Sequence, residues 1–221
     1  MGLNMIGVAP VSTGLAARGY SATVPPARDE EENRIRARNA GPLPTQSAIR
    51  NPKSEIMRIL GIDPGLERTG YGVIELAAGV GAPRLVEAGV IRTRRTDALA
   101  DRLIEIRSGL AAVLEEFKPD AVAVEALYSH YRHPRTAILM GHARGIVLAA
   151  AAEAGARVES YGATRIKKVL VGSGHASKQQ IQRAIQSAFR LQETPYPPDV
   201  ADALAVALCH AHHAGRVAHV R

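Results

Sequence analysis

Four acidic side chains stand where two predicted strands and one predicted helix can bring them together. Asp63 and Glu125 each end a short apolar run that is typical of a buried strand. Asp199 and Asp202 are three residues apart at the start of a predicted final helix, so both project from one face of its first turn. Ligands of open α/β sheets bind at the carboxyl ends of the central strands, and we therefore expect the four carboxylates to converge there.

Converging carboxylates repel one another strongly unless divalent cations lie between them. Hard oxygen ligands of this kind select Mg²⁺ or Mn²⁺. Two such ions about 3.5–4 Å apart can activate a water, polarise a phosphodiester and stabilise the leaving oxygen of an in-line displacement. The pattern therefore predicts two Mg²⁺ ions per active site, with Mn²⁺ as a substitute, and phosphodiester hydrolysis as the reaction.

Each acid also has a purely structural interpretation. Asp63 lies in a turn signal, Asp63-Pro-Gly, and Glu125 could be a solvated strand end. Asp199 could cap the final helix, and Asp202 could interact favourably with the dipole of that helix. Local sequence alone leaves both interpretations open at all four positions.

The overall composition narrows the class of protein. The 28 lysines and arginines exceed the 21 acids by seven, which favours a polyanionic partner such as nucleic acid. No apolar run approaches the roughly 20 residues that a membrane-spanning helix needs, which argues against a membrane protein. The single cysteine cannot form an internal disulfide and favours a reducing compartment, so we expect the cytoplasm.

The first 56 residues differ from the rest of the chain. They hold six of the 13 prolines and short charge blocks without helical or strand periodicity, so we predict a disordered extension. A start codon misassigned upstream of Met57 is the favoured explanation. An organelle-targeting peptide is the alternative, because Met1–Arg28 contains arginines but no acid.

The chain from Met57 onward is predicted to be one mixed α/β domain, residues 57–213, followed by a flexible tail, residues 214–221. It still contains 21 basic and 16 acidic residues, so the basic character belongs to the domain. Apolar runs predict an antiparallel three-strand meander and two parallel strands, and helical spacing predicts five helices. The predicted strands cover residues 58–63, 70–76, 84–91, 121–125 and 157–161, and the predicted helices residues 97–117, 136–154, 163–171, 177–189 and 198–213.

Basic side chains follow the second acidic strand and recur on later helices. His130, Arg132, His133 and Arg135 come shortly after Glu125 in a predicted loop, where they could hold phosphates near the acids. Lys167 and Lys178 add positive charge on two later helices. The alternative for such a run is a solvated helix face.

The cysteine and histidines near the C-terminus, Cys209, His210, His212 and His213, allow a zinc interpretation. It is disfavoured, because no second ligand cluster follows at finger spacing and the segment continues a helix. Histidines in a last helical turn already interact favourably with the helix dipole.

Several motifs together resemble the RuvC family of bacterial Holliday junction resolvases, in order and in spacing. A lone Gly-Ile-Asp-Pro-Gly is shared with sugar kinases and actin-like ATPases, but the ordered set, spanning Met57 to about His213, is specific. The matching segments are Ile59–Gly65 with Thr69–Val73, Val124-Glu125 with the aromatic Tyr128 three residues on, Gly141–Gly145, Lys167 with Lys178, and Asp199–Ala205.

The resemblance implies an RNase H-like fold and a homodimer that makes magnesium-dependent, symmetric nicks in a four-way DNA junction during recombination and repair. It implies that Asp63, Glu125, Asp199 and Asp202 are the metal-binding catalytic set. It also implies a RuvA–RuvB branch-migration complex as partner and places Lys167 and Lys178 beside the scissile backbone.

Two departures from the family pattern are visible. The first 56 residues have no counterpart, and Tyr128 stands where the family commonly has Phe. A tyrosine keeps a flat face for stacking on an unpaired base, and Arg132 in the same loop is predicted to contact DNA. An ordinary half-buried aromatic is the alternative for Tyr128.

Two other functions compete with a junction endonuclease. An actin-like phosphotransferase would share the Asp63-Pro-Gly turn, but it needs two duplicated domains, and about 165 residues hold one. A non-enzymatic junction-binding module would use the acids only as caps and turns. For the dimer, the apolar, alanine-rich helix from Thr136 is the predicted interface.

Overall fold

A five-stranded mixed sheet, in the order β3-β2-β1-β4-β5, is the centre of the fold. The computed structural model describes residues 56–77, 81–127 and 134–215. All of them belong to the second of the two units into which the chain divides, Asn51–Arg221. The predicted extension, residues 1–56, therefore lies outside the described residues except for Ile56, and so does most of the predicted tail.

The strands form the predicted meander and parallel pair. β1 (Ile56–Asp63), β2 (Arg68–Ala77) and β3 (Arg84–Arg92) are antiparallel neighbours. β4 (Ala121–Glu125) lies parallel to β1, and β5 (Arg157–Tyr161) lies parallel to β4. The predicted five-stranded α/β sheet is thus confirmed, with β2 starting two residues earlier than its apolar run suggested.

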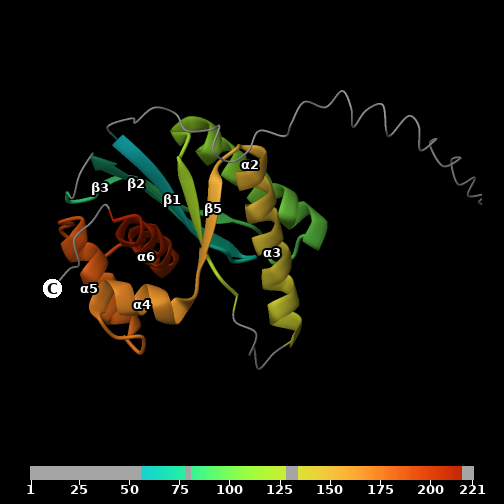
Figure 1. Cartoon of the computed structure of the whole chain (residues 1–221). Helices are drawn as coiled ribbons and strands as arrows, with labels where there is room; N and C mark the ends of the chain where they lie inside the picture. The colour runs from blue at the N-terminus through green and yellow to red at the C-terminus, as the bar shows by residue number, and fades with distance from the viewer. Residues whose placement is uncertain (1–55, 78–80, 128–133, 216–221) are drawn as a thin grey trace, which may run out of the picture. The chain divides into compact units, whose positions relative to one another are not determined.

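Helices cover both faces of the sheet, as Figure 1 shows. α2 (Leu99–Phe117) and α3 (Pro134–Glu153) pack on one face. α4 (Ala163–Val171), α5 (Lys178–Ala188) and α6 (Pro198–His213) belong to the other. In the residues that the structure describes, no helix is long and apolar enough to cross a membrane.

Alternation along the strands assigns each side chain to one of two cores. In β1, Leu60 and Ile62 pack with α2 and α3, whereas Ile59 packs with α6. In β4, Val122 and Val124 join the first core and Ala123 the second. β4 is therefore buried on both faces, which is why its sequence is an unbroken apolar run.

Three glycines let α6 lie directly on the sheet. A Cβ atom at Gly61 would lie 2.2 Å from the carbonyl oxygen of Ala203, and one at Gly70 would lie 2.2 Å from that of Asp199. A Cβ atom at Gly72 would overlap the side chain of Leu204. Hydrogen on these three α-carbons is thus what allows the helix backbone to touch β1 and β2.

The ends of the short helices have identifiable causes. Ser177 and Gln180 form a reciprocal capping box that starts α5 directly before Lys178. Gly172, with φ of 78°, ends α4 in the left-handed conformation. Pro198 occupies the first turn of α6, where its missing N–H has no intrahelical acceptor. These signals determine where α5 and α6 begin, and therefore the positions of Lys178 and Asp199 in their first turns.

The contact between α6 and β2 predicts that Gly70→Ala destabilises the protein. The new methyl group has no room against the Asp199 carbonyl, so the helix must move at a cost of about 1–3 kcal/mol. Urea unfolding would measure the loss. Gly81→Ala is the control, because Gly81 is exposed and its Cβ would meet nothing within 4 Å, and equal stabilities of the two variants would contradict the account.

Candidate active site

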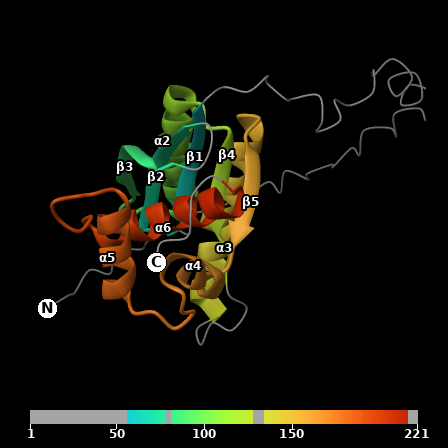
Figure 2. The same cartoon turned by 60° about the vertical axis from the view of Figure 1, so that its left-hand side comes forward.

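The four predicted acids lie at one edge of the sheet, on the face that carries α6. Asp63 is the last residue of β1 and Glu125 the last residue of β4, and these strands are parallel neighbours with Ile62 opposite Val124. Asp199 and Asp202 lie in the first turns of α6, which crosses this face as Figure 2 shows. The contact of Gly70 with the Asp199 backbone places the start of α6 beside the end of β1, because Gly70 is opposite Asp63.

The electrostatics of Asp63 show that the carboxylates have converged. Burial raises the pKa of Asp63 to about 7, helped by the negative charges of Glu125, Asp202 and Asp199 in that order. The pKa of Glu125 is raised by burial and by Asp202, and a side-chain hydrogen bond with Asp63 opposes the rise. At neutral pH the two strand-end carboxyls therefore share a proton for much of the time.

Basic side chains balance the two aspartates of α6. Nζ of Lys178 lies 3.4 Å from Oδ2 of Asp202, and an Nη atom of Arg68 lies 3.9 Å from Oδ2 of Asp199. Lys167 lowers the pKa of Glu125, which places its charge at the same site. Both ion pairs are partly exposed and contribute little to stability, so their main effect is electrostatic balance.

The donor set at this edge fits a hard divalent cation. Among residues 56–77, 81–127 and 134–215, no three acidic, histidine or cysteine side chains are already arranged around one point as a metal site. A shared proton, Lys178 and Arg68 instead supply the positive charge at the four acids. All four acids offer only carboxylate oxygens, and a raised carboxyl pKa means that added positive charge would be favourable.

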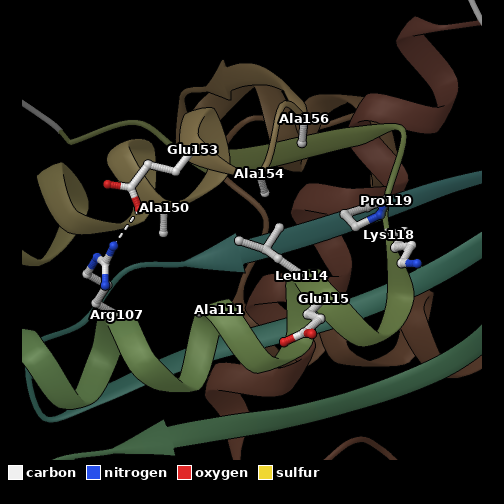
Figure 3. A pocket seen from close by; sticks show the side chains of 10 residues that line it. All are labelled: Arg107, Ala111, Leu114, Glu115, Lys118, Pro119, Ala150, Glu153, Ala154 and Ala156. Carbon is white, nitrogen blue, oxygen red and sulfur yellow. Dashed lines mark hydrogen bonds and ion pairs between the residues drawn. The ribbon is translucent and has the colours of Figure 1, made fainter.

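Two cavities in the described part of the chain differ in size and in their position relative to the acids. A cavity of only about 50 Å³ lies beside them, and its lining includes Glu125, Lys167 and Asp202. A larger cavity of about 570 Å³ lies between α2 and α3, shown in Figure 3 with the ion pair of Arg107 and Glu153 across it. That cavity is next to the residues that lead into β4 and β5, at the other end of these strands from the acids.

The structure brings six of the eight predicted site residues together. Asp63, Glu125, Asp199 and Asp202 interact electrostatically, and Lys167 and Lys178 lie at the same edge. Tyr128 and Arg132, the remaining two, lie outside the described residues.

The histidine-rich end of α6 has a structural role. Burial lowers the pKa of His210, and the neutral ring pairs through Nδ1 with the Tyr161 hydroxyl at 2.8 Å. Cys209 is buried, and burial raises the pKa of its thiol to about 11. In the described residues no group of three or more metal-binding side chains forms here.

Sequence reasoning missed two features of the site. Arg68 reaches Asp199, and its only sequence signal is its place directly after the Asp63-Pro-Gly turn. Arg165 lies over the ring of Tyr161, 5.6 Å from its centroid, and an Nη atom of Arg165 is 3.1 Å from Nδ1 of His213. Together with the pair of Tyr161 and His210, this contact fixes α4, and hence Lys167, against α6.

Comparisons with known proteins agree with this geometry. Residues 59–210 match the family described as Crossover junction endodeoxyribonuclease RuvC. A relative of that name from Rhodopirellula baltica is 55% identical over 153 residues, 68% of this chain and 84% of the relative. One from Halorhodospira halophila is 46% identical over 157 residues, 71% and 90% of the two chains.

A solved structure extends the likeness to three dimensions. The T. thermophilus RuvC in complex with Holliday junction substrate is 40% identical, with a TM-score of 0.67, over 72% of this chain and 94% of that one. The same fold, a sheet edge with four acids and a match over most of the domain lead to one conclusion. The chain belongs to the RuvC family of crossover junction endodeoxyribonucleases, which have an RNase H-like fold.

Proposed function

We propose that this protein cuts four-way DNA junctions at the acidic edge of its sheet, by divalent-metal-dependent phosphodiester hydrolysis. The observation that carries the proposal is the electrostatic coupling of Asp63 to Glu125, Asp199 and Asp202 inside a basic protein. Bound divalent cations would make such a cluster favourable. Membership of the family argues against the actin-like phosphotransferase.

The four acids would hold two Mg²⁺ ions, with Mn²⁺ as a substitute. When bound, such ions polarise the phosphodiester and make a water nucleophilic near neutral pH. Asp63 and Glu125 are held rigidly by the strand ends, whereas Asp199 and Asp202 are carried by α6. The proton that Asp63 and Glu125 share is the one that a bound cation would release.

The two lysines would act on the phosphate. Lys178 stands at the capped start of α5, 3.4 Å from Asp202, and Lys167 lines the small cavity beside Glu125. Their positive charges are placed to hold the scissile phosphate and to stabilise the negative charge that develops on its oxygens. Tyr128 and Arg132 remain predicted DNA contacts in the loop after β4.

A homodimer would present two such sites to the junction. α3 exposes Ile138 and Leu139, and Cβ atoms added at Gly141 or Gly145 would meet nothing within 4 Å. Ile138, Gly141 and Gly145 recur at helical spacing and form an uncovered stripe of apolar and small residues. An isologous contact along this stripe would fix the two sites for paired cuts in strands of like polarity.

The wider setting follows from the family. We infer that the protein acts in the bacterial cytoplasm, together with a RuvA–RuvB branch-migration complex, during recombination and DNA repair. The single, buried cysteine fits a reducing compartment. Residues 1–56 are proposed to be an extension that the nuclease domain, residues 57–213, does not need.

Asp63→Asn is expected to abolish cleavage and to preserve junction binding. An amide cannot replace the metal-binding carboxylate, so the rate should fall by about 1000-fold or more, whereas the DNA-contacting surface is unchanged. Cleavage of a synthetic four-way junction with Mg²⁺, and binding without it, measure the two effects. The control is Glu105→Gln on the exposed face of α2, with linear duplex as control substrate.

Undiminished cutting by Asp63→Asn would remove Asp63 from the catalytic set. Junction binding without any cutting by the unmodified protein, with Mg²⁺ or with Mn²⁺, would favour the non-enzymatic module instead.

The metal-free protein should lose stability as the pH rises. Folded Asp63 keeps its proton up to about pH 7, whereas the unfolded chain loses it near 3.8, so folding is favoured at low pH and this advantage disappears between those values. Asp63→Asn removes the contribution of Asp63 to this dependence and should be more stable than the unmodified protein at pH 8, by on the order of a few kcal/mol.

Urea unfolding in the presence of a chelator, at pH 4.5 and pH 8, measures this difference. Added Mg²⁺ should then stabilise the unmodified protein more than the variant. A variant that is less stable than the unmodified protein at pH 8 would mean that the carboxylates do not repel one another.

Ile138→Asp should convert the dimer to a monomer, because a charge in the uncovered stripe of α3 cannot be desolvated without a partner. Light scattering after size-exclusion chromatography measures the mass. Ile104→Asp is a matched control, since Ile104 on α2 is 63% exposed and Ile138 is 60% exposed. Dimers in both variants would exclude the stripe as the interface.

A further inference from the structure

We propose that Arg68, Arg92, Arg94 and Arg95, here called the arginine flank, bind the phosphates of a duplex arm beside the active site. The inference rests on the proposed function, because it assigns a second contact surface to the same DNA substrate. All four side chains are exposed, and all lie at the sheet edge that carries the acids. Nothing in the sequence motifs marks them.

The sheet order places this flank next to the acids. Arg68 begins β2 and Arg92 ends β3, and the two residues are paired across the antiparallel ladder. Paired residues of antiparallel strands project from the same face. Arg68 reaches Asp199 of α6, so both arginines project from the face on which the acids lie.

The acids therefore lie between two basic groups. Along the edge, the strand order gives Arg92 on β3, Arg68 on β2, Asp63 on β1 and Glu125 on β4. Beyond β5 follows α4, which carries Lys167. β1 and β3 are two strand spacings apart, about 10 Å, which is close to the roughly 12 Å width of a DNA major groove. A duplex with one backbone at the acids could thus present its other backbone to the arginine flank.

The loop that carries the flank is held firmly. The backbone N–H of Thr93 donates to the Glu67 carbonyl at 3.1 Å, and its hydroxyl donates to the Leu66 carbonyl at 2.6 Å. Nε of Arg102, a buried residue of α2, donates to the same hydroxyl at 3.0 Å. These bonds tie the β3–α2 connection to the β1–β2 turn, so little conformational entropy is lost when a ligand binds.

Two of the four flank arginines, Arg92 and Arg94, have no side-chain partner in the described part of the fold. Arg58 and Arg84 both bind the buried Glu75, but in the described residues Arg92 and Arg94 form no ion pair and no side-chain hydrogen bond. Placing Arg68 directly opposite Arg92 is itself destabilising, because like charges meet across the strands. Arg95 pairs with the exposed Glu67 at 3.4 Å and Arg68 with Asp199 at 3.9 Å, so Arg92 and Arg94 are the two arginines that an external anion would explain.

Phosphodiester groups fit this surface best. A guanidinium donates two parallel hydrogen bonds to a phosphate, and an arginine side chain remains charged at every physiological pH. The arginine flank lies next to the acidic site, whose proposed substrate has a phosphate backbone. The arginines of the flank lie along the same edge of the sheet as the acids. An acidic protein segment is the competing ligand. It would not explain why the arginine flank lies beside the four acids.

The test is a double variant that removes two positive charges, Arg92→Ala with Arg94→Ala. Its affinity for a labelled four-way junction and for linear duplex is measured by fluorescence anisotropy without divalent metal. The control pair, Arg107→Ala with Arg157→Ala, removes the same charge from exposed positions on α2 and at the start of β5. Affinity should fall about tenfold for both DNAs, and the slope of log affinity against log salt should decrease by about 2 per protomer, in the flank variant only. The corresponding lysine pair should restore the slope.

The outcomes separate the two proposals. If the unmodified protein neither binds nor cuts the junction, the proposed function fails. If it does both and the flank and control pairs behave alike, the arginine flank is not a DNA contact. A loss confined to the junction would overturn the assignment to a duplex arm, and a thermal unfolding midpoint close to that of the unmodified protein shows that the flank variant is folded.

Discussion

The direct contact between the backbone of α6 and the sheet is the constraint on which the site depends. Asp63 and Glu125 are fixed by strand ends, but Asp199 and Asp202 reach them only because α6 approaches β1 and β2 without intervening side chains. Gly61, Gly70 and Gly72 create that approach through their contacts with the helix. A methyl group at Gly61 or Gly70 would meet the helix backbone and carry two of the four carboxylates away from the others. The geometry of the acidic site therefore depends directly on this packing.

That geometry gathers negative charge inside a positively charged protein. Burial and neighbouring carboxylates raise the pKa of Asp63 to about 7, so the cluster without bound cations is electrostatically unfavourable. Lys178 and Arg68 reduce the repulsion from the side of α6, and a shared proton reduces it between the strand ends. An electrostatically unfavourable cluster of this kind is expected where a protein binds cations, as proposed for this site.

Much of this arrangement could be predicted from the sequence. Apolar runs that end in a carboxylate predicted the strands β1 and β4. A predicted helix directly before β4 indicated a crossover connection, and hence that β4 is a parallel strand. The pair of aspartates at the start of α6 was visible from spacing alone. Close packing by Gly61 and Gly70 was not, because a glycine in a strand shows neither which element it faces nor how near that element lies.

The arginines show the same limit. Arg68 and Arg92 are 24 positions apart, and only the register of β2 and β3 reveals that they are opposite each other. Charge counts predicted a basic domain but could not say which side chains the fold uses internally. That distinction needed the partners of Arg58 and Arg84 on Glu75.

The buried position of the single cysteine has a practical consequence. Cys209 lies in the C-terminal half of α6, with its thiol pKa raised to about 11, so almost no reactive thiolate exists in the folded protein at neutral pH. Alkylating reagents and oxidants can reach this thiol only after α6 has moved away from the sheet. The rate of thiol labelling therefore reports, without any introduced probe, how often the helix that carries Asp199 and Asp202 detaches.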